Sequence, residues 1–417
     1  MPNPRYEALT TAVHVPSIVI ATTLDTKHAE AACMREALAA EGLNTILIDC
    51  GILSDPSLTP DISAGEVAAL GGVSLDELRS RHDRAVAIET MTTGLAACLD
   101  MLGRRGVISG FLALGGGTNT ALAAAAFRQL PYGVPKLLVA TTVSGNTAPI
   151  LDAKDVVLIH SVVDILGTGP YLKALFKRSA KVMNALVNTV DDYPASKDSI
   201  GVTAFGSTTA AAERIFDLLS AAGHDVLTFH ARGSGGRAVE AFLRDHRLRL
   251  MLDLTTTEIA DEVVGGTMSA GPTRLEAAVE MGVPQVLLPG AIDMVNFGPL
   301  ETVPAKFADR LLLSHTPQTT LMRTSAAEVA DVARIMAAKL ERALAPATFI
   351  VPMQGFSAYD KAGAPFFDPA ADKAFVEALE SSLRSDIPIM KIDAHINDPM
   401  VADIAVDILL KSAAAAN

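Results

Sequence analysis

The chain has 417 residues, of which 50% are hydrophobic and only 19% charged, so it is not disordered throughout, and its length favours two domains over one. The formal net charge of −13 argues against nucleic acid as the main partner, because a phosphate backbone needs lysine and arginine to neutralise it. This charge is compatible with a small anionic ligand, since helix N-termini and backbone N–H groups bind phosphate.

The first half of the chain opens with a predicted βαβ unit. Ser17–Thr22 (SIVIAT) and Thr45–Asp49 (TILID) are apolar runs of strand length. The segment His28–Ala40 between them is rich in helix-forming residues, and Gly42 ends it. Strand, helix and strand in this order are typical of a parallel pair with a crossover helix.

The rest of the first half continues the alternation. A loop-rich insert is predicted at Ile52–Gly72, followed by a helical stretch at Leu75–Leu102 that we expect to break near Thr92–Gly94. We then predict strands at Val107–Leu114, Lys136–Ala140 and Val156–Ile159, and helices at Ala121–Gln129 and Tyr171–Val187.

A polar stretch from Asp191 to Asp198 contains Pro194 and predicts a linker. The pattern restarts behind it, with a strand at Ser199–Ala204 and a helix at Ala210–Ala222. Further strands are predicted at Asp225–Phe229, Leu248–Leu254, Pro284–Leu288, Thr348–Pro352 and Ile387–Asp393. We therefore predict an N-terminal domain over residues 1–190 and a C-terminal domain over residues 198–417.

Alternating strands and helices in both halves predict the α/β class, with two Rossmann-like domains that each hold a mainly parallel sheet flanked by helices. In open sheets of this kind, ligands bind beyond the carboxyl ends of the strands, where the strand order switches. Loops rich in glycine, threonine and serine follow the predicted strands, so we expect the binding residues at this edge.

Three such loops in the first half predict one shared phosphate or nucleotide site. Glycines let the backbone approach a ligand, and the helix that follows offers free N–H groups. The alternative for each loop is a tight strand–helix turn with a capping threonine or asparagine. The candidate cofactor-binding residues are Thr23, Asp25, Thr26, Lys27, Gly115, Gly116, Gly117, Thr118, Asn119, Thr120, Thr142, Ser144, Gly145 and Asn146.

Two of these residues are charged and could interact with the polar and charged groups of a nucleotide. Lys27 could neutralise a phosphate, or it could be a solvated lysine at the start of a helix. Asp25 could hold Mg²⁺ or a ribose hydroxyl, or it could cap the same helix. The loop Gly115–Thr120 (GGGTNT) matches neither the Walker A pattern nor GxGxxG.

The loops of the second half carry more charge and suggest an active site. A histidine beside arginine and a glycine loop is a candidate for proton transfer, although a lone histidine at a strand end is more often structural. Arg274 follows another turn and could bind an anion. The candidate catalytic residues are His230, Arg232, Glu258, Asp293 and His395.

A metal site near the C-terminal end is conceivable but is not predicted. Asp393 and His395 share one side of an extended segment. Only one histidine is present, however, and no second ligand pair is visible. In the alternative interpretation, Asp393 and Asn397 cap a last helix at Pro399–Lys411.

The cysteines and the N-terminal segment indicate a cytoplasmic protein. Cys33, Cys50 and Cys98 are odd in number and lack CxxC spacing, which argues against a disulfide framework. The first 15 residues lack the pattern of a signal peptide, and no apolar run reaches the roughly 18 residues of a membrane span. We therefore expect no membrane partner.

Eight stretches, in order over nearly the whole chain, match the motifs of a known family. They are Ala21–Lys27 (ATTLDTK), Gly133–Lys136 (GVPK), Ser144–Asn146 (SGN), Gly235–Ala238 (GGRA), Asp253–Glu258 (DLTTTE), Ser269–Pro272 (SAGP), Asp293–Gly298 (DMVNFG) and Asp393–Pro399 (DAHINDP). On these motifs the chain resembles the Tm-1-like ATP-binding (UPF0261) family. Its glycine loop departs from the family pattern, because Thr118 and Asn119 stand where glycines are expected.

The resemblance implies two Rossmann-like domains, an ATP site in the first of them, with or without Mg²⁺, and a homodimer. Our leading hypothesis is therefore a nucleotide-binding metabolic protein. One alternative is an enzyme that acts on a small carboxylated or phosphorylated metabolite in the C-terminal domain. The other is a regulatory or interaction protein in which ATP is a structural ligand.

Overall fold

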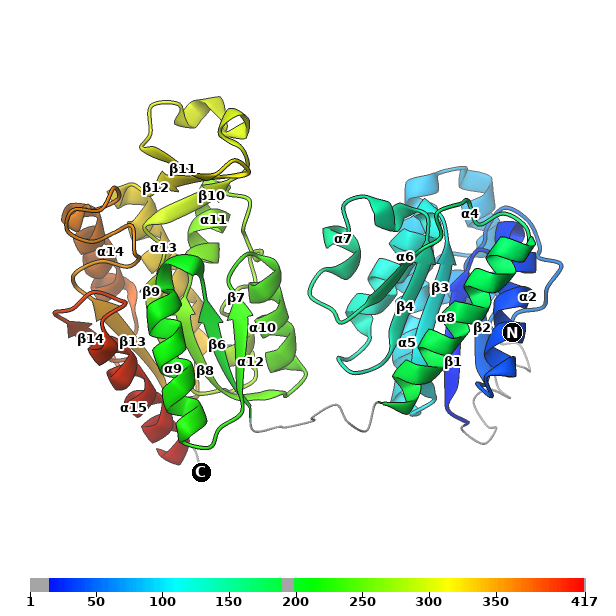
Figure 1. Cartoon of the computed structure of the whole chain (residues 1–417), viewed down its shortest axis with the longest axis horizontal. Helices are drawn as coiled ribbons and strands as arrows, with labels where there is room; N and C mark the ends of the chain where they lie inside the picture. The colour runs from blue at the N-terminus through cyan, green and yellow to red at the C-terminus, as the bar shows by residue number, and fades with distance from the viewer. Residues whose placement is uncertain (1–14, 190–198, 416–417) are drawn as a thin grey trace. The chain divides into compact units, whose positions relative to one another are not determined.

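The computed structural model describes residues 15–189 and 199–415, and the chain divides into two compact units, residues 1–194 and 195–417 (Figure 1). Each unit is a mainly parallel sheet flanked by helices, which confirms the predicted fold class. The predicted linker at residues 191–198 lies outside the described residues.

The N-terminal unit is built on five parallel strands in the order β2-β1-β3-β4-β5. Its inner strands are apolar along their length because helices cover both faces of the sheet. The strands are β1 (Ser17–Thr22), β2 (Thr45–Asp49), β3 (Ile108–Gly115), β4 (Lys136–Ala140) and β5 (Val157–His160). The helices are α2 (Leu24–Ala40), α3 (Ala64–Leu70), α4 (Leu75–Arg81), α5 (Arg84–Arg104), α6 (Gly117–Gln129), the 3₁₀ turn η1 (Thr142–Ser144), α7 (Ala148–Leu151) and α8 (Pro170–Asn188).

Alternate residues of each strand face opposite layers of helices. Ile18 and Ile20 of β1 pack with α2 and α8, whereas Val19 and Ala21 pack with α3, α5 and α6. The crossover from β1 to β2 therefore runs on one face, and the crossover from β3 to β4 runs on the other. The strand order switches between β1 and β3, which is where this topology places a ligand.

The C-terminal unit repeats the design with six parallel strands in the order β14-β13-β9-β8-β6-β7. They are β6 (Ser199–Ala204), β7 (Val226–His230), β8 (Leu248–Thr255), β9 (Gln285–Gly290), β13 (Ala347–Pro352) and β14 (Ile389–Ile392). Helices α9 (Thr209–Ala221) and α15 (Pro399–Ala415) cover one face. The other face is covered by α10 (Ser234–Arg244), α11 (Thr257–Val264), α12 (Ala277–Glu280), α13 (Ala326–Lys339) and α14 (Pro369–Ser382). Short 3₁₀ turns lie at η3 (Gly206–Thr208), η4 (Leu300–Thr302), η5 (Ala305–Phe307) and η6 (Leu340–Arg342).

An antiparallel sheet that the sequence did not predict is inserted between β9 and α13 (yellow in Figure 1). It consists of β10 (Met294–Phe297), β11 (Leu312–Thr316) and β12 (Thr319–Arg323), in the order β10-β12-β11. The turn between β11 and β12 is formed by Pro317 and Gln318 and lacks the Asn-Gly or Asp-Gly signal of a two-residue hairpin. The sequence therefore contains little local signal for this inserted sheet.

The segment before β3 also differs from the prediction. The helical stretch breaks at His82, which has a left-handed φ of 50°, and Asp83 then caps α5. Thr92–Gly94, where we expected the break, lies inside the continuous helix α5. The insert predicted as loop contains α3, whose start is fixed by a capping box of Ser63 and Glu66.

Helix α5 is the one helix among the described residues that is long and apolar enough to cross a membrane by length and composition. Within this domain, however, 44% of its apolar window is buried. Its residues Leu95, Cys98 and Leu99 belong to the core that α3 and α6 share. This packing is that of a domain core helix.

The close approach of α5 to α3 depends on Gly94. A Cβ atom at this position would lie 1.9 Å from the Val67 carbonyl oxygen, which is backbone and cannot rotate away. We expect Gly94→Ala to destabilise the protein by about 2 kcal/mol, because overpacking forces the two helices apart. Denaturant unfolding would measure the loss.

Gly103→Ala is the matched control in the same helix. Its Cβ atom meets nothing within 4 Å, so the higher helix propensity of alanine should leave stability unchanged or raise it by about 0.5–1 kcal/mol. Equal effects of the two substitutions would contradict the packing argument.

Candidate functional site

The loops that follow β1 and β3 are joined by the side chain of Asn119. Its Oδ1 accepts a hydrogen bond from the Thr23 backbone N–H (3.0 Å), and its Nδ2 donates to Thr23 Oγ1 (3.1 Å). Thr22 Oγ1 also donates to the Leu114 carbonyl oxygen across the same gap (3.1 Å). Asn119 is buried, so it positions the two loops at the strand-order switch.

A cavity of about 580 Å³ opens beside these loops. Four of the predicted cofactor-binding residues line it, namely Thr23, Asp25, Thr26 and Thr118. The other lining residues are Cys50, Ile52, Leu53, Leu78, Arg79, His82, Asp83, Arg84, Ala87, Ile88, Met91 and Leu122. The cavity therefore combines an apolar wall with a charged rim, as small-molecule sites usually do.

The charged rim comes mainly from α4 and the start of α5, which sequence reasoning did not assign to the site. Arg84 Nη2 donates to Thr118 Oγ1 (3.0 Å), linking α5 to α6 across the cavity mouth. Arg79 donates to the Ile52 carbonyl oxygen (2.9 Å) and forms an ion pair with Asp55 (2.9 Å). The sequence did contain a signal for this rim, because residues 79–84 (RSRHDR) carry five charged or titratable side chains in a chain that is 19% charged.

Asp25 stands at the cavity with one carboxylate oxygen engaged. Its Oδ2 accepts from the Leu53 N–H (2.8 Å), whereas its buried Oδ1 has no hydrogen-bond partner among the described residues. A Cβ atom on Gly51 would lie 2.6 Å from the Asp25 carboxyl carbon, so glycine is needed there. Burial raises the pKa of the adjacent Asp49, and the charge of Asp25 adds to the rise, although N–H groups of Gly51 and Leu24 oppose it.

The start of α6 is open toward a ligand. Gly115 has a φ of 140°, and a Cβ atom there would lie 2.3 Å from the Asn119 amide nitrogen. Gly116 and Gly117 have open space where a side chain would lie, and no side chain caps the helix. Uncapped N–H groups and the helix dipole favour an anion at this point.

The remaining predicted residues of this domain do not line the cavity. Thr120 Oγ1 bonds to Thr142 Oγ1 (2.7 Å) and holds the β3 and β4 loops together. Asn146 Oδ1 accepts from the Ala148 N–H (3.1 Å), and Ser144 Oγ donates to the Thr141 carbonyl oxygen (3.3 Å). Thr142, Ser144 and Gly145 thus form the turn η1 and its C-cap, and Asn146 bonds the first residue of α7.

Lys27 also lies outside the cavity lining. Its Nζ donates to the Ile165 carbonyl oxygen (2.6 Å), and the helix is distorted at this residue, with φ −127° and ψ 22°. The lysine therefore fastens α2 to the loop after β5.

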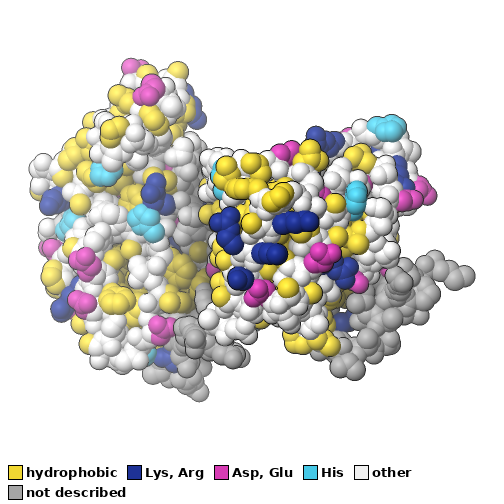
Figure 2. All heavy atoms as spheres, turned by 45° about the vertical axis from the view of Figure 1, so that its right-hand side comes forward, with side chains coloured by type: hydrophobic (Ala, Val, Ile, Leu, Met, Phe, Trp, Pro, Cys, Tyr) yellow, Lys and Arg dark blue, Asp and Glu magenta, His cyan; other side chains and the backbone are white. Residues whose placement is uncertain are grey.

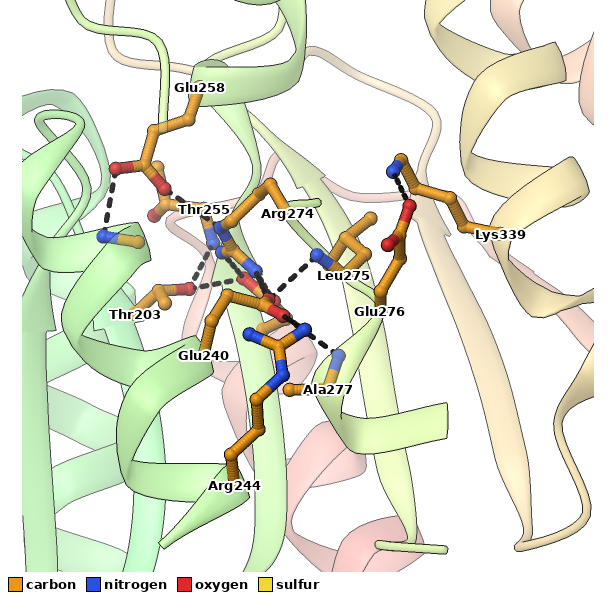
Figure 3. Close-up of polar contacts among 12 residues, drawn as sticks. Thr203, Glu240, Arg244, Thr255, Glu258, Arg274, Leu275, Glu276, Ala277 and Lys339 are labelled. Atoms are coloured by element: carbon orange, nitrogen blue, oxygen red, sulfur yellow. Dashed lines mark hydrogen bonds and ion pairs between the residues drawn. The ribbon is translucent and has the colours of Figure 1, made fainter. Parts of the chain in front are cut away.

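In the C-terminal unit, Glu258 belongs to a buried ionic cluster around Arg274 (Figure 3). Arg274 makes a bidentate pair with Asp253 (2.6 and 2.7 Å), bonds Glu258 (2.8 Å) and lies 3.5 Å from Glu240. Glu258 also accepts from the N–H groups of Gly233 (2.6 Å) and Gly236 (3.0 Å). Burial raises the pKa values of Glu240 and Glu258 against the opposing effect of Arg274. The cluster joins α10, β8, α11 and the segment before α12.

Asp293 belongs to a second buried cluster, around Arg323 of β12. Arg323 forms an ion pair with Asp372 (2.9 Å) and lies 3.7 Å from Asp360, while Ser357 Oγ donates to Asp293 Oδ2 (2.7 Å). Burial and the charge of Asp360 raise the pKa of Asp293 to about 7 and that of Asp372 to about 8, opposed by Arg323. Arg323 thus pairs with two carboxyl groups, Asp360 and Asp372, and reaches Asp293 only through its backbone carbonyl oxygen (3.2 Å).

The other candidate catalytic residues lie elsewhere on this unit. His230 and Arg232 are exposed at the end of the edge strand β7, and His230 stacks on Phe205 beside a hollow of about 310 Å³. Burial and the charge of Arg232 lower the pKa of His230. His395 Nε2 forms a hydrogen bond with the Ser357 carbonyl oxygen (2.8 Å), and His395 Nδ1 accepts a hydrogen bond from the Asn397 N–H (3.2 Å).

The structure therefore does not gather the five candidates into one exposed site. Glu258 and Asp293 are fully buried in separate clusters. Asp393 accepts a hydrogen bond from Gln354 Nε2 (2.9 Å). Among the residues that the structure describes, no group of three or more histidine, cysteine, aspartate or glutamate side chains is arranged to hold a metal ion.

The Arg323 cluster predicts a pH dependence of stability. A carboxyl group whose pKa is about 8 when folded and near 3.8 when unfolded takes up a proton on folding between these pH values, so its contribution to stability falls as pH rises from about 4 to about 8. Asp372→Asn cannot ionise, and we expect a smaller loss of stability between pH 5 and pH 8 than in the unsubstituted protein. Denaturant unfolding at both pH values measures the difference.

Asp407→Asn, on the exposed face of α15, is the control for that experiment. It removes a carboxylate without touching the cluster and should leave the pH dependence unchanged. An identical loss between pH 5 and pH 8 in Asp372→Asn and in the unsubstituted protein would contradict the assignment.

Comparison with protein families gives matches over both units. The model described as "Uncharacterised protein family (UPF0261) N-terminal domain" matches residues 16–192, and the C-terminal domain model of the same family matches residues 197–413. A UPF0261 protein of Clostridium tetani is 41% identical over 91% of this chain and 95% of its own length. A UPF0261 protein of Rhizobium meliloti is 40% identical over 93% and 97%.

A plant protein and a solved structure complete the comparison. The ToMV resistance protein Tm-1(GCR237) of Solanum lycopersicum is 36% identical over 79% of this chain, which corresponds to 45% of that protein. A UDP-N-acetylglucosamine 2-epimerase from Rickettsia bellii aligns over 97% of both chains, but with 11% identity and a TM-score of 0.24. A score this low supports no inference about function.

Proposed function

This chain belongs to the UPF0261 family, and we propose that its N-terminal unit binds a nucleotide, ATP with or without Mg²⁺, in the cavity at the β1/β3 switch. The observation that carries the proposal is an apolar-walled cavity of about 580 Å³ whose rim holds two arginines and Thr118 of the uncapped first turn of α6; Gly115, Gly116 and Gly117 lie next to Thr118 in the chain but do not line the cavity. A nucleotide has the matching parts, namely an anionic phosphate chain and an apolar aromatic base.

The phosphates would lie at the start of α6. The backbone N–H groups there are uncapped, the space beside Gly116 and Gly117 is open, and Arg84 stands across the mouth. Arg79 adds a second cation to the same rim. Guanidinium groups bind phosphate through paired N–H donors, which suits this rim better than a single lysine would.

The base would lie against the apolar wall. Leu53, Ile88 and Met91 line this side of the cavity, and flexible methionine suits a planar ring. Mg²⁺, if bound with the nucleotide, would take the free Oδ1 of Asp25, because magnesium is usually held by one or two carboxylates and the phosphates. Thr23, Thr26 and Thr118, which were predicted from the sequence, would add hydroxyl donors beside the nucleotide.

Isothermal titration with ATP and ADP, with and without Mg²⁺, tests the proposal. We expect binding to the unsubstituted protein and a loss of affinity of about tenfold or more in Arg84→Ala, since a hydrogen bond to a charged group contributes roughly 1.5–3 kcal/mol. Arg104→Ala is the matched control, because Arg104 is an exposed arginine at the far end of the same helix. No heat of binding at millimolar nucleotide would refute the proposal.

Gly117→Ala separates binding from folding in the same assay. Alanine improves helix propensity at the first residue of α6 and meets no protein atom within 4 Å, so stability should not fall. Its methyl group enters the space assigned to the phosphates, so affinity should fall. Phosphate release from bound ATP, measured on the same samples, distinguishes an enzyme from a protein that holds ATP as a regulatory or structural ligand.

A further inference from the structure

The loop after β5 exposes an unusual number of large hydrophobic side chains. Val162, Val163, Leu166 and Tyr171 have exposed fractions of 69, 43, 74 and 47%. Only three other large hydrophobic side chains, Val15, Leu53 and Leu70, are exposed among the described residues of the N-terminal unit. We name residues 162–171 the apolar loop; its last two residues, Pro170 and Tyr171, are already the first turn of helix α8.

The fold holds the apolar loop in place. Ser161 is buried, its Oγ donates to the Val163 carbonyl oxygen (2.7 Å), and the Val163 N–H donates to the Ser161 carbonyl oxygen (2.7 Å). Between them, Val162 has a φ of 65°, a left-handed conformation that is strained for a β-branched residue. Lys27 and Glu30 of α2 bind the backbone further along the loop. The hydrophobic side chains are therefore exposed by an anchored backbone.

Helix α8 continues from the apolar loop and carries a basic face, which we define as Lys173, Lys177, Lys181 and Arg178. The three lysines lie four residues apart, so they form one ridge on successive turns. All four side chains are exposed, and none makes an ion pair with a described residue. Figure 2 shows Lys and Arg side chains gathered on one face of the N-terminal unit, with hydrophobic side chains beside them.

The charge of this surface is opposite to that of the whole chain. Helix α8 contains no aspartate or glutamate, and the apolar loop has one carboxylate, Asp164. Glu30 and Glu36 of α2 lie near Cys33 together with Lys173 and Lys177, and the buried Glu30 also accepts from the Gly167 N–H of the loop. Four exposed cations against these three carboxylates therefore leave the surface locally positive in a chain of net charge −13.

We propose that the apolar loop and the basic face together dock on the surface of an anionic phospholipid bilayer. The cations would lie among the anionic head groups, and the side chains of Val162, Val163 and Leu166 would enter the head-group and acyl boundary. A nucleic acid would engage the cations but offers nothing for protruding aliphatic side chains. The acidic remainder of the chain would be repelled, which orients the protein with this face toward the lipid.

The inference revises the sequence-based expectation of no membrane contact, which rested on the lack of a spanning segment. Peripheral docking needs no such segment. It is also independent of the proposed nucleotide site, because none of its residues lines that cavity.

Co-sedimentation of the full chain with vesicles tests the inference. We expect binding to vesicles of phosphatidylcholine with about 30 mol% phosphatidylserine, a composition that gives a strongly anionic surface. We expect little binding to vesicles of phosphatidylcholine alone. The double substitution Lys177→Glu and Lys181→Glu should lower partitioning about 25-fold or more, since each cation near an anionic surface contributes roughly fivefold. The control is Arg342→Glu with Lys361→Glu, which makes the same change in net charge at exposed positions of the C-terminal unit and should leave partitioning within about twofold.

Val162→Gly tests the apolar contribution without endangering the fold. Glycine accepts a positive φ freely, so thermal stability should be unchanged or higher, while vesicle binding should fall. Leu166→Ser should lower binding in the same direction. Equal binding to neutral and anionic vesicles would overturn the inference. So would a loss confined to the lysine variants with Val162→Gly and Leu166→Ser unaffected, because that result would indicate a polyanion such as nucleic acid.

Discussion

The candidate site depends on one amide side chain. Asn119 accepts from the Thr23 N–H and donates to the Thr23 hydroxyl, and so fixes the gap between the loops after β1 and β3. These loops belong to crossovers on opposite faces of the sheet, and beyond the β1–β3 pairing and the Thr22–Leu114 hydrogen bond it is Asn119 that links them. Gly115 is constrained by the same contact, because any larger residue would meet Asn119. The cavity and the open start of α6 follow from this arrangement.

Thr118 and Asn119, at the two positions where the resemblance led us to expect glycines, have distinct roles in this arrangement. Thr118 faces the cavity and bonds Arg84, while Asn119 turns inward to Thr23. Thr118 therefore adds a polar group to the rim, and Asn119 adds a brace behind it. Both leave Gly116 and Gly117 free of side chains at the helix start.

Much of the fold was predictable because its signals are local. Apolar runs such as Ser17–Thr22 and Lys136–Ala140 coincide with β1 and β4, and the small-residue loops after β1 and β3 were expected to converge. The charged rim of the cavity was not predicted, although Arg79 and Arg84 stand in a run of charged residues, because the break between α4 and α5 falls at His82, whose left-handed conformation has no clear sequence signal. Glu258 and Asp293 were predicted to be catalytic because each is an acidic residue in a loop that follows a strand. The sequence pattern of such a residue is the same whether its carboxylate faces a ligand or a buried arginine.

The antiparallel insertion enters and leaves the C-terminal unit at one point. Thr324 donates to the carbonyl oxygens of Asp293 (3.0 Å) and Ile292 (2.9 Å), so the two ends of the insertion are adjacent, and a short turn could connect them if β10 to β12 were deleted. Arg323 is nevertheless the last residue of β12, whereas the carboxyl groups that it neutralises belong to the body of the unit. The geometry would therefore allow the insertion to be removed, but the buried carboxyl groups of the unit depend on its arginine. A minimal version of this domain would need its buried acids replaced together with the deleted strands.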